Sequence, residues 1–206
     1  MNVYEAIATR RDVRAEFTGA PVADDVLTRV LGAAHAAPSV GHSQPWDFVL
    51  VRDRATRTRF HGHVTAERAT YAASLPPERA STFEAIRVEG VLDATLGVVV
   101  THDPDRGGPQ VLGRHTIDDA GLYSTCLAIQ NLWLAATAEG LGVGWVSFYR
   151  EPFLRDLLGI PAGVRPVAWL CVGPVSHLHD RPDLERHGWR ERRPLADAVH
   201  HEKYGS

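Results

Sequence analysis

The stretch YSTCLAIQNLWLAATAEGLGVGWVSFY, residues 123–149, decides the fold of this chain. Its first part, Tyr123–Glu139, contains no glycine or proline and is apolar on most sides, which predicts a buried, central helix. Gly140 predicts the end of that helix, because glycine readily adopts the left-handed conformation of a helix stop. Val143–Tyr149 follows as a predicted strand. The stretch therefore places one long helix and one strand in the core.

The rest of the chain supplies more elements of both kinds. The sequence predicts three further strands, at Trp46–Arg52, Thr95–Thr101 and Pro166–Gly173. It predicts helices from a cap at Asn2 to Arg10-Arg11, from a cap at Asp24 or Asp25 to just before Pro38, over most of Asp53–Gly90 with a break at Pro76-Pro77, and over Pro152–Leu158. No strand–helix–strand unit repeats, so the pattern favours an α+β fold with flanking helices over a doubly wound sheet.

Composition restricts the class of protein. The chain has 206 residues, 44% of them hydrophobic and 23% charged, which predicts one globular domain over 1–206 that buries roughly 70% of its unfolded surface. A net charge of −3 gives no general attraction to nucleic acid or anionic membranes. No stretch is long and apolar enough to span a bilayer, and no secretory leader is visible. Cys126 and Cys171 lie in apolar surroundings and are expected to be buried thiols, so a reduced, cytoplasmic protein is expected.

Three segments could carry chemistry. Arg10-Arg11-Asp12-Val13-Arg14 offers three guanidinium groups that suit a phosphate; in an extended chain Arg10, Asp12 and Arg14 share one face. The alternative is a solvated basic helix end. The loop from Ala37 to Trp46 is fixed by two prolines, and Gly41 permits a close approach or a positive φ; the alternative is an ordinary connection with Trp46 in the core. The glycines of 140–147 would allow the backbone to approach a planar ligand closely. The alternative is that they only relieve crowding between neighbouring segments of the protein.

Other features are less specific. The Gly-rich loop Asp103–Asp119 has the length of a lid or binding loop. The polar segment from His177 has few apolar groups of its own and is expected to dock as an arm, on a partner subunit for instance. The pairs His61/His63 and His177/His179 lack acidic or cysteine partners at ligand spacing, so no metal site is expected.

Taken in order, these segments are similar to one known family. Arg10–Arg14, Pro38-Ser39-Val40-Gly41 with Gln44-Pro45-Trp46, Val88-Glu89-Gly90, Arg106–Thr116, Ala128–Ala136 and Gly144-Trp145-Val146-Ser147 together resemble the FMN-dependent nitroreductase superfamily. Within it, they resemble the branch that fragments reduced FMN. The match runs from the first helix to Arg192-Arg193-Pro194-Leu195, nearly the whole chain.

The resemblance implies a homodimer with a mostly antiparallel sheet of four to five strands, FMN at the subunit interface, and C-terminal arms (177–206) that cross to the partner. It also implies that reduced FMN and O2 yield 5,6-dimethylbenzimidazole and a four-carbon sugar phosphate, with a separate NAD(P)H-dependent flavin reductase as the electron source. FMN would then be consumed as a substrate.

The resemblance also implies residue roles. Asp12 and Ser147 correspond to the essential carboxylate and hydroxyl of the branch. The residues expected to bind FMN are Arg10, Arg11, Asp12, Val13, Arg14, Pro38, Ser39, Val40, Gly41, Gln44, Gly144, Trp145, Ser147 and Arg192. We expect the nearby arginines to depress the pKa of Asp12.

Two alternatives remain at this point. A conventional NAD(P)H-dependent nitroreductase or flavin reductase would use the same pocket and conserve FMN in each turnover. A non-catalytic FMN-binding protein would retain the arginines and tolerate replacement of Asp12 and Ser147.

Overall fold

A four-stranded antiparallel sheet forms the centre of the protein. The computed structural model describes residues 1–205, and its strands are β1 (Trp46–Val51), β2 (Leu96–His102), β3 (Leu141–Val146) and β4 (Arg165–Pro174). They lie in the order β1-β2-β4-β3, and every neighbouring pair is antiparallel. The predicted α+β fold and the antiparallel sheet are confirmed.

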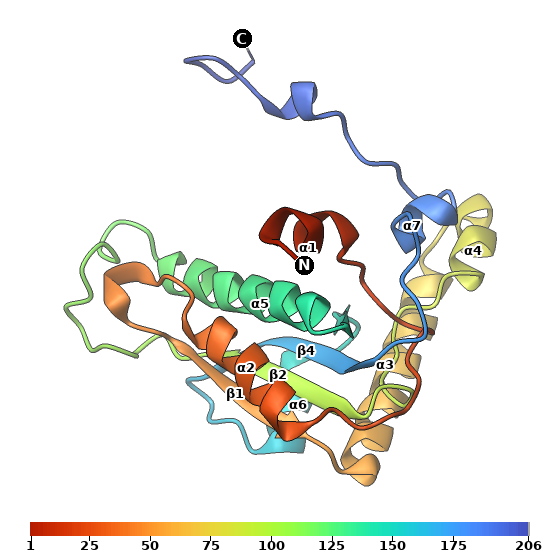
Figure 1. The fold of residues 1–206 in the computed structure, drawn as a ribbon, viewed down its shortest axis with the longest axis horizontal. Helices are drawn as coiled ribbons and strands as arrows, with labels where there is room; N and C mark the ends of the chain where they lie inside the picture. Colours follow the sequence, from red (N-terminus) through yellow and green to blue (C-terminus); the bar gives the residue numbers. More distant parts are fainter. Residues whose placement is uncertain (206) are drawn as a thin grey trace.

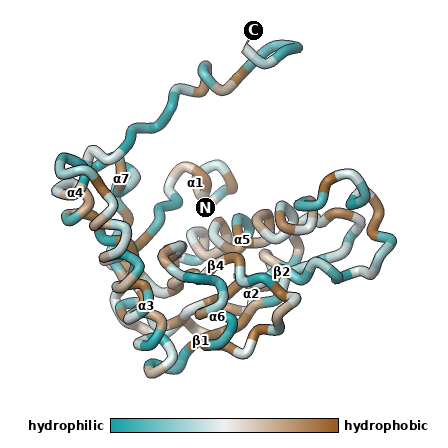
Figure 2. The backbone as a smooth tube through the Cα atoms, turned by 180° about the vertical axis from the view of Figure 1, so that it is seen from behind, coloured by the Kyte–Doolittle hydropathy of each residue, from teal (hydrophilic) through white to brown (hydrophobic). Residues whose placement is uncertain are grey.

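Helices cover both faces of this sheet (Figure 1). On one face lie α2 (Asp24–His35) and α5 (Ala120–Ala138), and on the other α3 (Arg54–Ala73) and α6 (Glu151–Leu158). Successive residues of the inner strands point to opposite faces, as a strand requires. Val98 and Val100 pack with α2 and α5, whereas Val99 packs with α3 and α6. Burial on both faces explains why the central strands are continuously apolar. In Figure 2 hydrophobic segments recur throughout the body of the protein, whereas the extended C-terminal segment is mostly hydrophilic.

The remaining helices are peripheral. They are α1 (Val3–Thr9), α4 (Pro77–Glu84) and α7 (Asp183–Arg186), with 3-10 turns at Val40–His42 and Leu195–Ala198. The predicted cap at Asn2 is confirmed: its side chain accepts from the Glu5 N–H, and the Glu5 carboxylate accepts from the Asn2 N–H. The predicted break at Pro76-Pro77 is confirmed as well, with Pro77 opening α4.

Three local expectations are wrong. Ala23 occupies the N-cap of α2 without a side-chain bond, because Asp24 and Asp25 lie within the helix and form ion pairs with Arg52 and Arg29. Strand β3 runs over Leu141–Val146 rather than Val143–Tyr149, so Gly142 lies inside it as Gly144 does. Cys171 is buried as expected, but Cys126 is exposed, because part of α5 faces outward.

The C-terminal segment has two parts. Residues 177–189 pack against the body of the protein through α7 and Trp189. Residues 190–205 are exposed throughout and extend away from the body (Figure 1). Of the segment expected to form an arm, residues 177–189 therefore belong to the fold and only residues 190–205 extend from it.

Candidate active site

Asp12 is held beside strand β3 by a short parallel pairing. Asp12 pairs with Val143, and the Val13 N–H donates to the Val143 carbonyl over 2.9 Å. The Asp12 carboxylate accepts from the Trp145 backbone N–H at 3.0 Å and from the Arg14 guanidinium at 2.5 Å. The expectation that Asp12 and Arg14 share a face is confirmed. One carboxylate is thus fixed at the edge of the sheet by a backbone donor and a charged donor.

The environment of Asp12 opposes its negative charge. Burial raises the pKa of Asp12 above its ordinary value, although the charge and hydrogen bond of Arg14, the Trp145 N–H and Arg10 all act to lower it. The expected depression by the arginines is therefore wrong in its net direction. The side chain keeps 36% of its surface exposed. The nearby protein atoms that displace water, rather than complete burial, therefore disfavour the charged form. Carboxylates with a raised pKa are common among groups that take part in acid–base chemistry.

Gly144 lets the Asp12 segment approach β3. A Cβ atom on Gly144 would lie 2.1 Å from the Val13 carbonyl oxygen, a backbone atom that cannot move aside alone. Close packing of two backbones therefore requires glycine here. The same crowding affects Gly142, where a Cβ would meet the side chains of Val175 and Val13.

The two arginines at the end of α1 have different surroundings. Arg11 donates to the carbonyls of Ala8 and Arg10 at 2.8 Å each and to that of Asp180, so it ties α1 to the C-terminal segment. The Arg10 guanidinium lies 4.8 Å from the centre of the Trp133 ring. Among the described residues, Arg10 has no carboxylate ion pair. Burial lowers the pKa of Arg10, and the charges of Arg11 and Arg192 lower it further, against the effect of Asp12. An anion would relieve this repulsion.

A cavity of about 230 Å³ lies beside Ser147. Ser147, just past the end of β3, lies at this cavity with Arg14 and Trp145, and the other walls are aromatic and aliphatic: Tyr71, Phe83, Ile86, Val88, Phe148, Leu184 and Trp189. Tyr71 and Phe83 come from the predicted helical region of 53–90, and Leu184 and Trp189 come from the C-terminal segment. Apart from Val88, the sequence patterns indicated none of these aromatic and aliphatic walls, because residues that are far apart in the chain meet only in the folded protein.

The predicted loop Pro38–Gln44 lies elsewhere in the same chain. The Val40 N–H donates to the Ser124 hydroxyl at 3.0 Å near the first turn of α5, and the Gln44 N–H donates to the Ser39 hydroxyl at 3.0 Å. Gly41 has a φ of 53°, and a Cβ there would lie 2.8 Å from the Leu112 nitrogen, so both expectations for Gly41 are confirmed. His42 and Gln44 also have positive φ. Trp46 is buried in the core, as the alternative interpretation held.

The candidate residues therefore form two groups in one chain. Asp12, Val13, Arg14, Gly144, Trp145 and Ser147 lie together, with Arg10 and Arg11 adjoining through Trp133, near the C-terminal half of α5. The group Pro38–Gln44 lies at the other end of that helix. Ser124 and Trp133, which mark the two ends, are nine residues apart, roughly 13 Å along a helix. Arg192 lies on the exposed arm.

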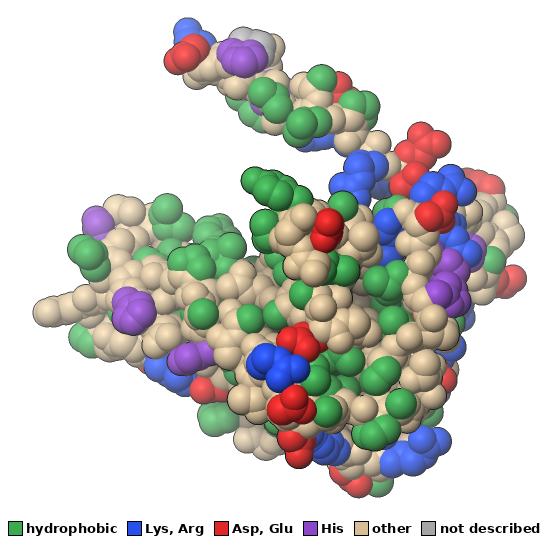
Figure 3. Space-filling view, in the orientation of Figure 1, with side chains coloured by type: hydrophobic (Ala, Val, Ile, Leu, Met, Phe, Trp, Pro, Cys, Tyr) green, Lys and Arg blue, Asp and Glu red, His purple; other side chains and the backbone are tan. Residues whose placement is uncertain are grey.

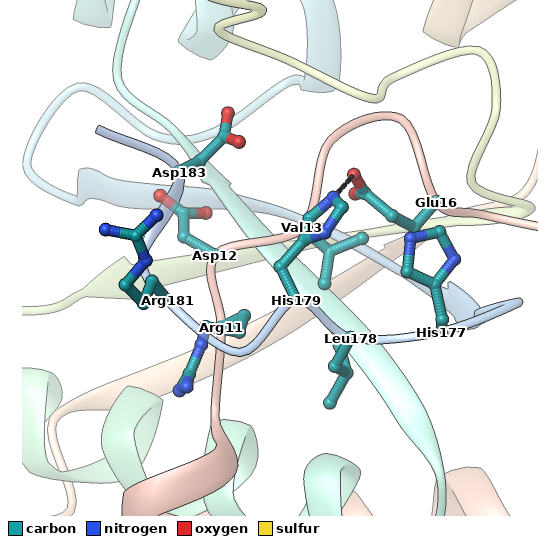
Figure 4. A pocket seen from close by; sticks show the side chains of 9 residues that line it. All are labelled: Arg11, Asp12, Val13, Glu16, His177, Leu178, His179, Arg181 and Asp183. Atoms are coloured by element: carbon teal, nitrogen blue, oxygen red, sulfur yellow. Dashed lines mark hydrogen bonds and ion pairs between the residues drawn. The ribbon is translucent and has the colours of Figure 1, made fainter. Parts of the chain in front are cut away.

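The C-terminal segment closes over the Asp12 segment on its far side. A cavity of about 10 Å³ lies between Arg11–Glu16 and His177–Asp183, and Figure 4 shows His179 reaching Glu16 across it. That contact measures 3.1 Å, and Glu16 also accepts from the backbone N–H groups of Arg14 and Ala15. Within residues 1–205, no group of His, Cys, Asp and Glu side chains has the arrangement of a metal site. No helix of the same range is long and apolar enough to cross a membrane.

Comparisons with known proteins agree on one family. The model of the nitroreductase family matches residues 7–174. A 5,6-dimethylbenzimidazole synthase of Rhodospirillum rubrum is 41% identical over 90% of this chain and 87% of its own length. A protein of that same name from Rhodobacter capsulatus is 35% identical over 92% of this chain and 91% of its own. The structure of iodotyrosine deiodinase bound to FMN and 3-iodo-L-tyrosine has a TM-score of 0.72 at 20% identity, over 86% of this chain and 92% of that one. The chain belongs to the nitroreductase family.

Proposed function

We propose that this protein uses O2 to fragment reduced FMN into 5,6-dimethylbenzimidazole and a four-carbon sugar phosphate. The observation that carries the proposal is the position of the Asp12 carboxylate. It lies at the edge of the sheet, accepts hydrogen bonds from Arg14 and the Trp145 N–H, and adjoins the cavity beside Ser147. The name of the 41% identical relative supports the reaction. FMN is a substrate here, and a separate NAD(P)H-dependent flavin reductase supplies its electrons.

The donor set fits a flavin mononucleotide. Arg10 has no carboxylate ion pair among the described residues, and its pKa is lowered by burial and then by the charges of Arg11 and Arg192. A phosphate dianion would neutralise that cluster. The cavity beside Ser147 has aromatic walls and a polar side made by Arg14 and Ser147, which suits a planar ring with one polar edge. Arg11 is left mainly to hold α1, since its terminal nitrogens already donate to backbone carbonyls.

Asp12 and Ser147 would provide the proton chemistry. Reduced FMN supplies the electrons that activate O2, and cleavage of its ribityl chain requires removal of protons from carbon or hydroxyl groups. A carboxylate with a raised pKa, held rigidly by two donors, suits a general base. The Ser147 hydroxyl lies at the same cavity and suits a proton relay or a hydrogen bond to the ring edge. Aromatic walls around the site would exclude water.

A homodimer would complete the site. The group Pro38–Gln44 and the Asp12 group lie at opposite ends of α5, so a second copy can bring its loop to the first copy's Asp12. The faces that such a copy would cover are apolar: Val3, Tyr4 and Ile7 of α1 and Tyr123 and Leu127 of α5 are exposed. Hydrophobic side chains are also visible on the surface in this region (Figure 3). The arm carries a further exposed apolar side chain, because Leu195 is 78% exposed. Exposed patches of this kind mark interfaces.

One assay tests the reaction. Chemically reduced FMN is mixed with the protein in air, without pyridine nucleotide, and 5,6-dimethylbenzimidazole is measured by mass spectrometry. The native protein is expected to form it, while Asp12→Asn binds FMN and leaves it intact. Product formation by Asp12→Asn at the native rate would remove Asp12 from the chemistry. Steady NAD(P)H consumption with FMN conserved would support the nitroreductase alternative, and FMN binding with neither reaction would support a binding protein.

A further inference from the structure

We propose that Arg79 is a positioning residue for ligand binding: by holding Trp189 against α4, it directs the C-terminal arm so that Arg192 reaches the phosphate end of the ligand. The proposal rests on the proposed function, because it assumes that FMN binds at the Arg10 cluster. Arg79 belongs to a segment for which the sequence suggested no role. Its contact with the C-terminal segment spans 110 residues of the chain.

The contact between Arg79 and Trp189 is specific in geometry. The Arg79 guanidinium carbon lies 3.8 Å from the centre of the Trp189 ring, and Arg79 also donates to the Trp189 carbonyl at 3.3 Å. Trp189 makes two further contacts. Its ring centre lies 6.0 Å from that of Phe83 in α4, and its backbone N–H donates to the Leu184 carbonyl at 2.8 Å. A stacked guanidinium that also holds the backbone fixes both the ring and the path of the chain.

Trp189 stands where the arm leaves the body. It is half-buried, whereas every residue from Arg190 to Gly205 is exposed. Arg192 follows three residues later and thus lies within about 10 Å of Trp189 along the chain. Burial and then the charges of Arg11 and Arg192 lower the pKa of Arg10, which supports a path of the arm on the Arg10 side of the protein. Lys and Arg side chains gather where the arm departs (Figure 3). Fixing Trp189 therefore limits where Arg192 can be.

Two like charges held together favour an anion between them. Without the contact to Arg79, the arm could turn away and separate Arg192 from Arg10. A phosphate would then bind more weakly, because binding would have to order the arm, and the conformational entropy lost in that step makes the binding free energy less favourable. A ligand without the phosphate would lose little.

The experiment compares FMN with riboflavin, which lacks the phosphate. Arg79→Ala and Arg192→Ala are each expected to weaken FMN binding about tenfold, a step of 1.4 kcal/mol. Riboflavin binding should be nearly unchanged in Arg192→Ala and should weaken less than FMN binding in Arg79→Ala, because Trp189 also lines the cavity beside Ser147. The double variant is expected to be no worse than Arg192→Ala alone. Arg79→Lys, which keeps the cation over the ring, should retain part of the affinity. Arg68→Ala is the matched control. The Arg68 guanidinium lies 4.9 Å from the centre of the Phe83 ring and donates to the carbonyls of Phe83, Glu84 and Ile86, and among the described residues it makes no hydrogen bond or ring contact with Trp189.

A ligand-free measurement checks the arm itself. Trypsin should cut within 190–193 faster in Arg79→Ala than in the native protein or Arg68→Ala. Equal weakening of FMN and riboflavin by Arg79→Ala, or full additivity with Arg192→Ala, would overturn the positioning role. A native protein that binds neither flavin would refute the proposed function and this inference with it, whereas a native protein that binds FMN normally while Arg79→Ala is unaffected would refute this inference alone.

Discussion

The surroundings of Asp12 both change its pKa and hold its carboxylate in place. An aspartate next to an arginine is ordinarily more acidic than a free one, yet burial reverses that effect here and raises the pKa of Asp12. Because the carboxylate is the form that accepts a proton, the geometry stabilises it with Arg14 and the Trp145 N–H at a site where charge is costly. This combination is typical of functional groups rather than of surface ion pairs.

The pH dependence of the reaction follows from that shift. Product formation should fall as the pH is lowered through the raised pKa of Asp12, which means at a higher pH than an ordinary aspartate would give. Asp12→Asn should reduce the rate at least about 100-fold above the raised pKa and should lack this fall at low pH. The rate of 5,6-dimethylbenzimidazole formation, measured with saturating reduced FMN from pH 4 to 8, checks both statements.

The free energy of unfolding should depend on pH in the opposite direction to the reaction rate. A raised pKa in the folded state means that folding disfavours the charged form, so the native protein loses stability relative to Asp12→Asn as the pH rises from the ordinary aspartate value to the raised one. Urea unfolding of both proteins at several pH values gives this difference. An acid limb at the ordinary pKa of aspartate, with no pH-dependent difference in stability, would contradict the interpretation of Asp12.

At the scale of elements, the pairing between residues 12–14 and β3 holds the site together. The Val13 N–H bonds the Val143 carbonyl, and the Asp12 carboxylate bonds the next N–H but one along β3. Both bonds require the backbones to lie closer than a side chain at Gly144 would permit. A single glycine thus fixes the distance between the carboxylate and the cavity beside Ser147.

Gly144→Ala should disrupt this pairing. The added methyl group would overlap the Val13 carbonyl oxygen, so we expect a loss of about 1–3 kcal/mol in the free energy of unfolding and a fall in product formation larger than the loss of FMN affinity. Gly32→Ala is the matched control: the position lies within α2 and has open space around it, and alanine there should be neutral or stabilising. Denaturant unfolding and flavin titration of both variants measure the effects. An unchanged Gly144→Ala protein would show that the close approach is not required.

At the scale of the molecule, one chain holds two separate groups of candidate residues and exposes apolar side chains. The loop Pro38–Gln44 and the Asp12 group lie toward opposite ends of α5, while Tyr4 of α1 is 80% exposed and Leu127 of α5 is also exposed. In the proposed homodimer a second copy covers these side chains. Burial of such side chains against a second copy would provide a driving force proportional to the apolar area removed from water. Assembly and ligand binding are then coupled.

Leu127→Glu should break that coupling. A charge at the centre of an apolar interface is costly unless it is paired, so the variant is expected to be monomeric in light scattering and to bind FMN at least tenfold more weakly. Leu50→Glu is the control, because Leu50 is comparably exposed but lies on the edge strand β1, on the side of the sheet away from β3. A dimeric Leu127→Glu protein, or a monomer with undiminished FMN affinity, would contradict a site shared by two subunits.

The sequence by itself determined most of the elements and named the candidate site residues. Local patterns fixed the helices, the strands, the Asn2 cap and the left-handed Gly41, because these depend on neighbours within a few residues. The tertiary structure decided what depends on distant contacts. It raised the pKa of Asp12 where neighbouring charges suggested the reverse, placed Gly142 inside β3, exposed Cys126, and brought Arg79 to Trp189. Burial and long-range packing are properties of the assembled chain, and no short stretch of sequence contains them.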